Sequence, residues 1–172
     1  FLIFLDFSIA VTLAMATVFI LVEMAGPYLA ERIDGGTPWH AHHIAERYSL
    51  FAIIALGEGV VGTVAALSAV IESQGWTMDV ALVGLAGIGL TFGMWWVYFM
   101  LPAAEVLHVH RRRSFVFGYG QMITITAIVA TGAGLHVAAN FIEHRSKIGP
   151  LATVLSVVIP VGIFLVSLYV TY

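Results

Sequence analysis

Residues 149–172 read GPLATVLSVVIPVGIFLVSLYVTY and contain no charged side chain. A helix of about 20 apolar residues crosses a hydrocarbon core of about 30 Å, so this stretch is long enough to span a membrane. The whole chain has the same character, because 60% of its 172 residues are hydrophobic and only 10% are charged. Soluble domains carry about 25% charged residues, and the mean hydropathy here is +1.00. The sequence therefore predicts an all-α fold, a polytopic bundle of transmembrane helices.

Polar breaks divide the chain into about five apolar segments of spanning length, which we interpret as a single transmembrane domain over residues 1–172. The predicted spans lie near residues 2–26, 44–71, 78–102, 115–142 and 149–172. The first is expected to end at Gly26 and Pro27, and Pro160 is expected to kink the fifth. Gly89 and Gly93 form a GxxxG step in the third span, and such small-residue steps let helices approach closely in lipid.

The composition excludes several classes of function. The chain has no cysteine, which excludes disulfide scaffolds, zinc ribbons, iron–sulfur clusters and thiol catalysis. Its only cluster of basic residues is Arg111 to Arg113, which is no footprint for nucleic-acid binding. No GxSxG, Walker, HExxH or Rossmann pattern occurs in a supporting context. We therefore expect no cofactor and no nucleic-acid partner, and no pattern supports enzyme activity.

Ionisable side chains inside a span cost roughly 2.5–3.5 kcal/mol each on insertion scales, so each calls for a partner or a function. The predicted spans contain Asp6, Glu23, Glu46, Arg47, Glu58 and His136. Glu58 is the most informative of them, because it lies halfway along the second span, near the expected bilayer midplane. Gly57 and Gly59 flank it and leave room for another backbone or a ligand. Glu58 is either a functional carboxyl group or a protonated glutamic acid hydrogen-bonded to a neighbouring helix.

A second group of polar residues opens the same span. Glu46 and Arg47 follow His43 by three and four positions, so the three side chains share one helix face. Arg47 and Glu58 are eleven positions apart, which places them on a common face but out of contact. This face would suit a route for ions or protons into the bundle. Equally, Glu46 and Arg47 could neutralise charges on adjacent helices.

The antiparallel order of the spans brings residues of similar depth to the same level. Glu23 and Gln121 are expected near the level of Arg47. Of these, Glu23 is the predicted ion-pair partner of Arg47, because the two carry opposite charges.

At the opposite level, Asp6 and His136 form a second predicted pair. His136 is either a hydrogen-bonded structural histidine or a proton carrier. Glu58 is then left with hydroxyl groups as its expected neighbours, those of Thr124 or Thr126.

His40, His42 and His43 form an HxHH cluster at the start of the second span. A metal site there would draw on His40 and His42, but the cluster lacks cysteine and the HExxH spacing. We therefore interpret these histidines as interfacial residues that cap the helix or form hydrogen bonds, and expect no metal. A membrane-embedded enzyme would need several ionisable groups around a pocket, and only His43, Glu46 and Arg47 could begin one.

Residues 43–58 read HIAERYSLFAIIALGE and resemble the bacterial low temperature requirement protein A (LtrA) family. The pattern of that family is approximately H-[IL]-x-E-R-x-x-L-F-x-I-I-x-L-G-E, and every fixed position is present. Residues 96–99 and 117–120 are similar to the aromatic end of the family's third span and the start of its fourth. Two positions depart from the pattern, since Met100 replaces an expected Asp and Gln121 replaces a frequent His.

The resemblance implies a longer protein, of which this chain is expected to be the carboxy-terminal part, because the family's amino-terminal Glu-x-Phe-Phe-Asp-Leu type motif is absent. It also implies a multi-pass protein of the bacterial plasma (inner) membrane.

The basic residues predict the orientation of the spans. One set of connections carries Arg32, Arg47 and Arg111 to Arg113, and the other carries Arg145 and Lys147. Cytoplasmic connections carry an excess of Lys and Arg, so five basic residues against two place the first set in the cytoplasm.

Two functional hypotheses follow. The first is a transporter or channel-like protein, coupled to an ion or to protons, in which Glu58 is the central polar group. The alternative is a membrane protein of stress adaptation that binds lipids or other proteins without transport. The expected partners are the lipid bilayer and, for the first hypothesis, a small ion or solute, while a homo-oligomer is left open.

Overall fold

The computed structural model describes residues 8–33, 38–142 and 147–172. These residues form helices and turns and no strand, which confirms the predicted all-α fold. Within the described residues, five helices are long and apolar enough to cross a membrane, as predicted. The chain divides into two compact units, Phe1–Trp39 and His40–Tyr172, which are described separately.

Helix α1, Ile9–Ile33, makes up most of the described first unit. The prediction that this span ends at Gly26 and Pro27 is wrong, because the helix continues through Pro27 to Ile33. Proline removes one backbone hydrogen-bond donor from a helix. In a membrane, however, ending the helix would leave several backbone amides and carbonyls without partners, so a helix that continues through the proline is favoured.

The second unit contains four long helices joined by short connections. Its elements are α2 (Ala41–Gln74), α3 (Met78–Phe99), the short α4 (Ala103–Val109), the 3-10 turn η2 (Arg111–Arg113), α5 (Ser114–Ile142) and α6 (Pro150–Thr171). The connection between the third and fourth spans is therefore helical. Between α2 and α3 the chain turns at Gly75, whose φ of 74° is in the left-handed region that favours glycine.

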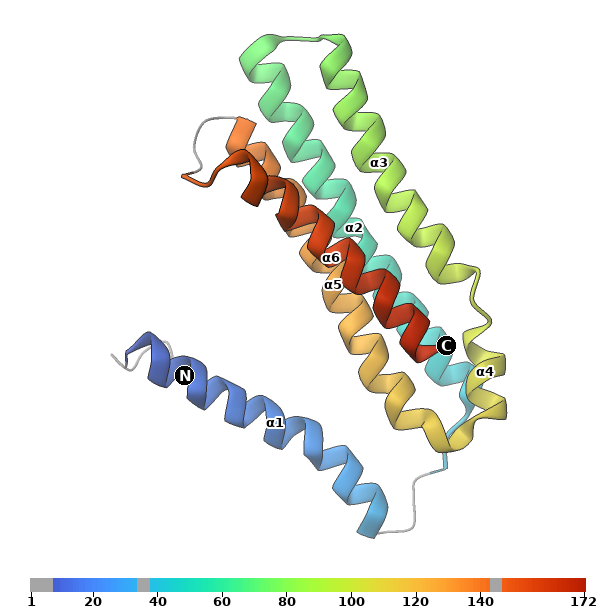
Figure 1. The fold of residues 1–172 in the computed structure, drawn as a ribbon. Helices are drawn as coiled ribbons and strands as arrows, with labels where there is room; N and C mark the ends of the chain where they lie inside the picture. Colours follow the sequence, from blue (N-terminus) through green and yellow to red (C-terminus); the bar gives the residue numbers. More distant parts are fainter. Residues whose placement is uncertain (1–7, 34–37, 143–146) are drawn as a thin grey trace. The chain divides into compact units, whose positions relative to one another are not determined.

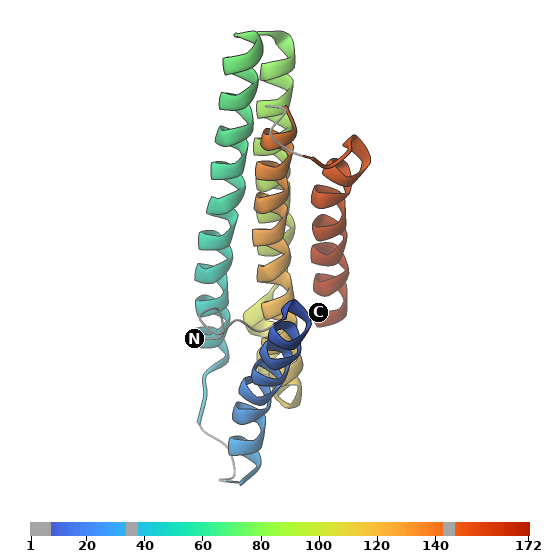
Figure 2. The same cartoon turned by 90° about the vertical axis from the view of Figure 1, so that its left-hand side faces the viewer.

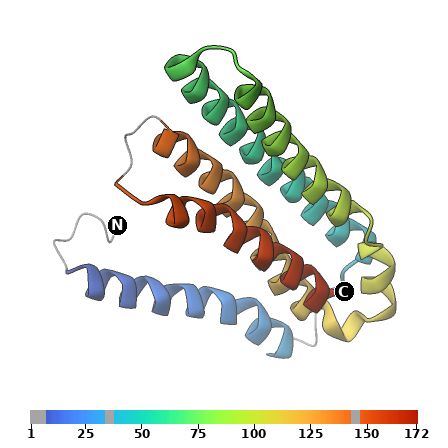
Figure 3. The same cartoon turned by 45° about the horizontal axis from the view of Figure 1, so that its top comes forward.

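Helices α2 and α5 lie at the centre of the second unit. Helix α2 packs against α3, α4 and α5, and α5 packs against α2 and α6. In Figure 1 and Figure 3, α2 with α3 and α5 with α6 form two antiparallel hairpins. Figure 2 shows α5 between α2 and α6. The main core lies where all four helices meet, around the buried Ala52, Met94, Ile128 and Phe164.

A reciprocal contact between glycine and threonine joins α2 to α3. Thr63 of α2 faces Gly87 of α3, and Thr91 of α3 faces Gly59 of α2, where a Cβ atom would lie 2.6 Å from Thr91 Oγ1. The Thr63 hydroxyl donates to the Gly59 carbonyl at 2.8 Å, and the Thr91 hydroxyl donates to the Gly87 carbonyl at 3.0 Å. Each hydroxyl is thus satisfied within its own helix, while each threonine fills the space left by the opposite glycine.

Helices α5 and α6 use the same kind of contact. Thr171 of α6 faces Gly120 of α5, and its hydroxyl donates to the Ser167 carbonyl at 2.6 Å. Thr124 and Ser167 then bring their hydroxyl oxygens to 2.9 Å across the two helices. Close approach without a hydrophobic driving force requires small residues at the contact, and each hairpin provides them.

Gly89 and Gly93 make no close helix contact within the described residues of the second unit, so the predicted GxxxG step is not used there. Nothing lies within 4 Å of the position that a Cβ atom would take at either residue, and both are exposed. The physical reason is helical rotation, since two positions separate Gly87 from Gly89 and turn them to different faces of α3.

Gly87, which faces Thr63, and Gly89, which faces no neighbour, make a matched test of the α2–α3 contact. We expect Gly87→Ala to lower the free energy of unfolding by about 1–3 kcal/mol, because the new Cβ would overlap Thr63. Gly89→Ala meets no neighbour and should be neutral or stabilising, by up to about 1 kcal/mol, through helix propensity. Equilibrium unfolding in mixed detergent micelles measures both. Equal effects of the two substitutions would contradict the described contact.

Candidate functional site

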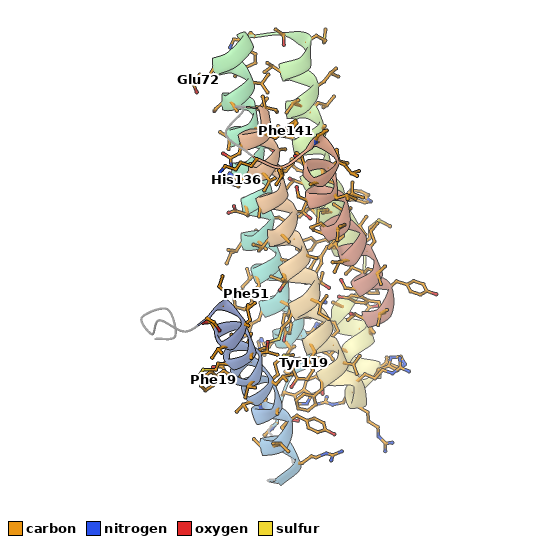
Figure 4. All side chains as sticks on the ribbon, turned by 60° about the vertical axis from the view of Figure 1, so that its left-hand side comes forward. Phe19, Phe51, Glu72, Tyr119, His136 and Phe141 are labelled. Atoms are coloured by element: carbon orange, nitrogen blue, oxygen red, sulfur yellow. The ribbon has the colours of Figure 1, made fainter. Side chains whose placement is uncertain are left out.

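Glu58 and His136 meet between the two central helices. The Nε2 atom of His136 lies 3.2 Å from Oε1 of Glu58, so α2 and α5 contribute one ionisable side chain each. Glu58 lies near the middle of α2, and His136 lies in the last third of α5. The Glu58 side chain is 41% exposed and that of His136 37%. The pair is therefore open to one face of the second unit, where Figure 4 labels His136.

Glycines at the crossing of α2 and α5 hold Glu58 close to α5. A Cβ atom at Gly132 would lie 2.7 Å from Cγ of Glu58, and one at Gly62 would lie 2.7 Å from the Gly132 carbonyl oxygen. Both contacts are too short for any residue larger than glycine. His136 follows Gly132 by one helical turn, which brings its ring to the level of the Glu58 carboxyl group.

The prediction that Thr124 or Thr126 is the neighbour of Glu58 is wrong. The Thr124 hydroxyl lies 2.9 Å from Ser167 Oγ, because Thr124 is on the face of α5 that packs against α6. Thr126 is exposed and donates to the Met122 carbonyl at 2.8 Å. The depth of a residue in a span fixes its level, but the rotation of the helix decides which neighbour it meets.

The remaining predicted ionisable residues are not part of this pair. Nδ1 of His43 lies 3.6 Å from Oε2 of Glu46, and both side chains are exposed, as is Arg47. Glu23 is exposed on α1 of the first unit, so its pairing with Arg47 stays a prediction. Asp6, the predicted partner of His136, lies outside the described residues.

A pocket of about 520 Å³ lies between the start of α2 and the connection from α3 to α4. His42, Glu46 and Ser49 of α2 line one side, and Glu105 of α4 lines the other. The pocket lies about three helical turns from Glu58 along α2, since Glu46 precedes Glu58 by twelve positions. Of the residues His43, Glu46 and Arg47, only Glu46 lines this pocket, which is separate from the Glu58–His136 pair.

Gln121 is the centre of a buried, neutral hydrogen-bond network. The Tyr98 hydroxyl donates to Oε1 of Gln121 at 3.0 Å, and Nε2 of Gln121 donates to the Tyr172 hydroxyl at 3.0 Å. Gln121 is 0% exposed and Tyr98 is 3% exposed. The network links α3, α5 and the residue that follows α6. An uncharged network of this kind fixes how the helices pack, because each buried polar group has its partner.

The histidines at the start of α2 lie near one another. The ring of His40 is 5.6 Å from that of His42 and 5.3 Å from that of His43, measured between centroids. Among the described residues, no group of three or more His, Cys, Asp or Glu side chains could hold a metal ion.

The sequence analysis missed the contact between Glu58 and His136. A signal for it exists, because Glu58 precedes Gly62 by four positions and Gly132 precedes His136 by four. Helices α2 and α5 run in the same direction, since Tyr48 meets Gly118 and Gly62 meets Gly132. Each spacing is about one helical turn, so at one crossing each helix presents a glycine together with an ionisable side chain. The role of Tyr172 was also missed, since nothing in its sequence neighbourhood indicates a partner on α5.

Comparison with known proteins identifies the family. The family model described as bacterial low temperature requirement A protein (LtrA) matches residues 1–172. Comparison with curated proteins and with solved structures finds no match. Residues 43–58, which carry the resemblance, lie within α2 and end at Glu58. With five helices of spanning length and a family match over all 172 residues, the chain belongs to the bacterial low temperature requirement A (LtrA) family.

Proposed function

We propose that this protein moves a small ion across the membrane and that the Glu58–His136 pair is its central group. The observation that carries the proposal is the 3.2 Å contact between Nε2 and Oε1, with one ionisable side chain on each central helix. In this proposal the pair lies near the midplane of a bacterial plasma membrane. Ionisable groups at that depth are costly and are usually kept for a function.

The face of α2 that carries Glu58 is exposed from the start of the helix to the pair. The face of α2 that carries Glu58 also carries Phe51 and Ile54, which are 58% and 72% exposed, and the exposed Arg47. In Figure 4, Phe51 lies further than His136 toward the α4 end of the helices. Phe51 and Ile54 are apolar and suit contact with lipid or with a further helix, so a route for ions from the start of α2 to the pair is itself part of the proposal.

We expect Glu58→Gln to reduce ion flux into reconstituted vesicles by roughly tenfold or more, because an amide cannot ionise. Flux is measured with ion-sensitive dyes enclosed in vesicles that contain the purified protein. Glu72→Gln is the matched control, since Glu72 is an exposed carboxyl group on the same helix. Wild-type flux in Glu58→Gln protein of normal yield would remove Glu58 from the mechanism.

A structural role without transport is the second candidate. The observation that favours it is the neutral network of Tyr98, Gln121 and Tyr172, which ties helices together and offers no charge for an ion. Under this alternative, vesicles with wild-type protein hold every ion gradient as well as empty vesicles do. Glu58→Gln would then change only the unfolding midpoint.

A further inference from the structure

We propose that the ion handled by the Glu58–His136 pair is the proton, bound and released by the two side chains themselves. This inference rests on the proposed function and adds the identity of the species. Three features of the described residues carry it: the number of ligands at the pair, the continuity of the two helices, and the chemistry of a carboxyl group beside an imidazole.

The pair offers too few ligands for a metal ion. Calcium takes about six to eight oxygen ligands and zinc about four ligands. Among the described residues, no third His, Cys, Asp or Glu joins Glu58 and His136 to make a group that could hold a metal ion. A proton needs only one donor and one acceptor, and the 3.2 Å between Nε2 and Oε1 provides both.

The backbone around the pair cannot supply the missing ligands. Helices α2 and α5 run without interruption through Glu58 and His136. Transporter sites for sodium and similar ions typically use broken helices, whose unwound carbonyl groups coordinate the ion. Here even the Gly59 carbonyl, one residue from Glu58, also accepts the Thr63 hydroxyl at 2.8 Å. Within the described part of the chain, a cation other than the proton would find ionisable side-chain ligands from only two residues.

Helices α3 and α6 contain few charged residues. Helix α6 contains no charged residue, and the only one in α3 is Asp79, at its second position. Tyr98 of α3 belongs to the buried network around Gln121. Glu105 of α4 lines the pocket at the start of α2 and precedes the arginines of η2. In this proposal, Glu58 and His136 are the ionisable groups among the described residues that exchange the proton, and water that reaches the pair supplies and removes it.

The two side chains can pass one proton at a time. In its neutral state, the pair holds one exchangeable proton, either on the imidazole beside a carboxylate or on the carboxyl group beside a neutral imidazole. Because Nε2 of His136 faces Glu58, Nδ1 is the nitrogen that exchanges with water. The cycle starts from a carboxylate beside a neutral ring that carries its proton on Nε2, so a proton that arrives at Nδ1 lets Nε2 give its own proton to Oε1. Release from the carboxyl group then leaves a carboxylate and a neutral ring with its proton on Nδ1, and exchange of the ring proton back to Nε2 completes the cycle, which moves one proton and no electrons.

The test compares proton flux with the flux of other cations in vesicles that contain the purified protein. Separate preparations receive a pH difference, a sodium gradient or a zinc gradient, each followed by its own dye. We expect the wild-type protein to dissipate the pH difference and to pass sodium and zinc no faster than empty vesicles. Glu58→Gln and His136→Gln should each lower proton flux roughly tenfold or more. Glu72→Gln and His108→Gln, which change exposed residues outside the pair, should keep it.

The outcomes separate this inference from the proposed function. Sodium or zinc flux that depends on Glu58, without proton flux, would overturn the proton assignment and leave ion movement intact. Absence of any flux that depends on Glu58 would overturn both.

A second variant guards against simple misfolding. The double variant Glu58→His with His136→Glu keeps a carboxyl group and an imidazole but places each on the other helix. Its proton flux should therefore exceed that of either single glutamine variant. If the double variant is monodisperse and yet conducts no better than Glu58→Gln, the pair is not the proton carrier.

Discussion

Replacing Gly132 with alanine is expected to lower the free energy of unfolding by about 1–3 kcal/mol and to separate Glu58 from His136. A Cβ atom at this position would lie 2.7 Å from Cγ of Glu58 and 2.9 Å from its carbonyl carbon. The second contact is with backbone, so no side-chain rotation relieves it and α2 must move away from α5. Flux through the pair should fall together with stability, although neither ionisable group has been changed.

The matched control is Gly57→Ala on α2. Nothing lies within 4 Å of a Cβ atom at Gly57, so this change should cost no stability and can gain up to about 1 kcal/mol of helix propensity. Unfolding in mixed micelles gives the stability of both variants. If Gly132→Ala were as stable as Gly57→Ala, the close crossing of α2 and α5 would be incorrect.

Gln121→Leu is expected to lower the free energy of unfolding by about 1–3 kcal/mol for each tyrosine hydroxyl that loses its partner. The amide of Gln121 serves Tyr98 and Tyr172 at once, with both bonds at 3.0 Å, and leucine offers neither donor nor acceptor. Thr126→Val is a suitable control, because its exposed hydroxyl bonds only within α5. Both variants can be compared by thermal unfolding in detergent.

A combined variant separates hydrogen bonding from packing. Adding Tyr98→Phe and Tyr172→Phe to Gln121→Leu removes the hydroxyl groups that the leucine leaves without partners. The triple variant should therefore recover part of the stability lost in Gln121→Leu. A triple variant less stable than the single one would show that the network contributes by shape and not by its hydrogen bonds.

The spans were predictable because the bilayer restricts the backbone to long helices, whose apolar runs are visible in the sequence. Residues 149–172 were predicted as a span, and α6 occupies Pro150–Thr171 within them. Pro27 shows the limit of such rules, since it was expected to end a helix that in fact continues to Ile33. A local preference of one residue is weaker than the need to keep the backbone hydrogen-bonded in an apolar surrounding.

The candidate site was predictable only in part, because partners depend on helix rotation. Glu58 and His136 were each predicted as candidate site residues, because an ionisable side chain inside a span is energetically costly. Their contact with one another was not predicted. Depth alone favoured Thr124 as the neighbour of Glu58, but Thr124 faces Ser167 on α6. The rotation is set by the glycines at the crossing, whose partners become visible only when both helices are placed.

The pairing of helices has a further consequence for the Glu58–His136 contact. Neighbours in sequence, α2 with α3 and α5 with α6, are each joined by their own glycine and threonine contacts. The contacts that join the two helices of a hairpin therefore lie within that hairpin, whereas the ionisable pair joins Glu58 of one hairpin to His136 of the other. Neither half of the second unit contains the pair by itself. A rocking of one hairpin against the other would therefore act on this contact and on the hydrogen bond from Tyr98 to Gln121, and would leave the glycine and threonine contacts within each half intact.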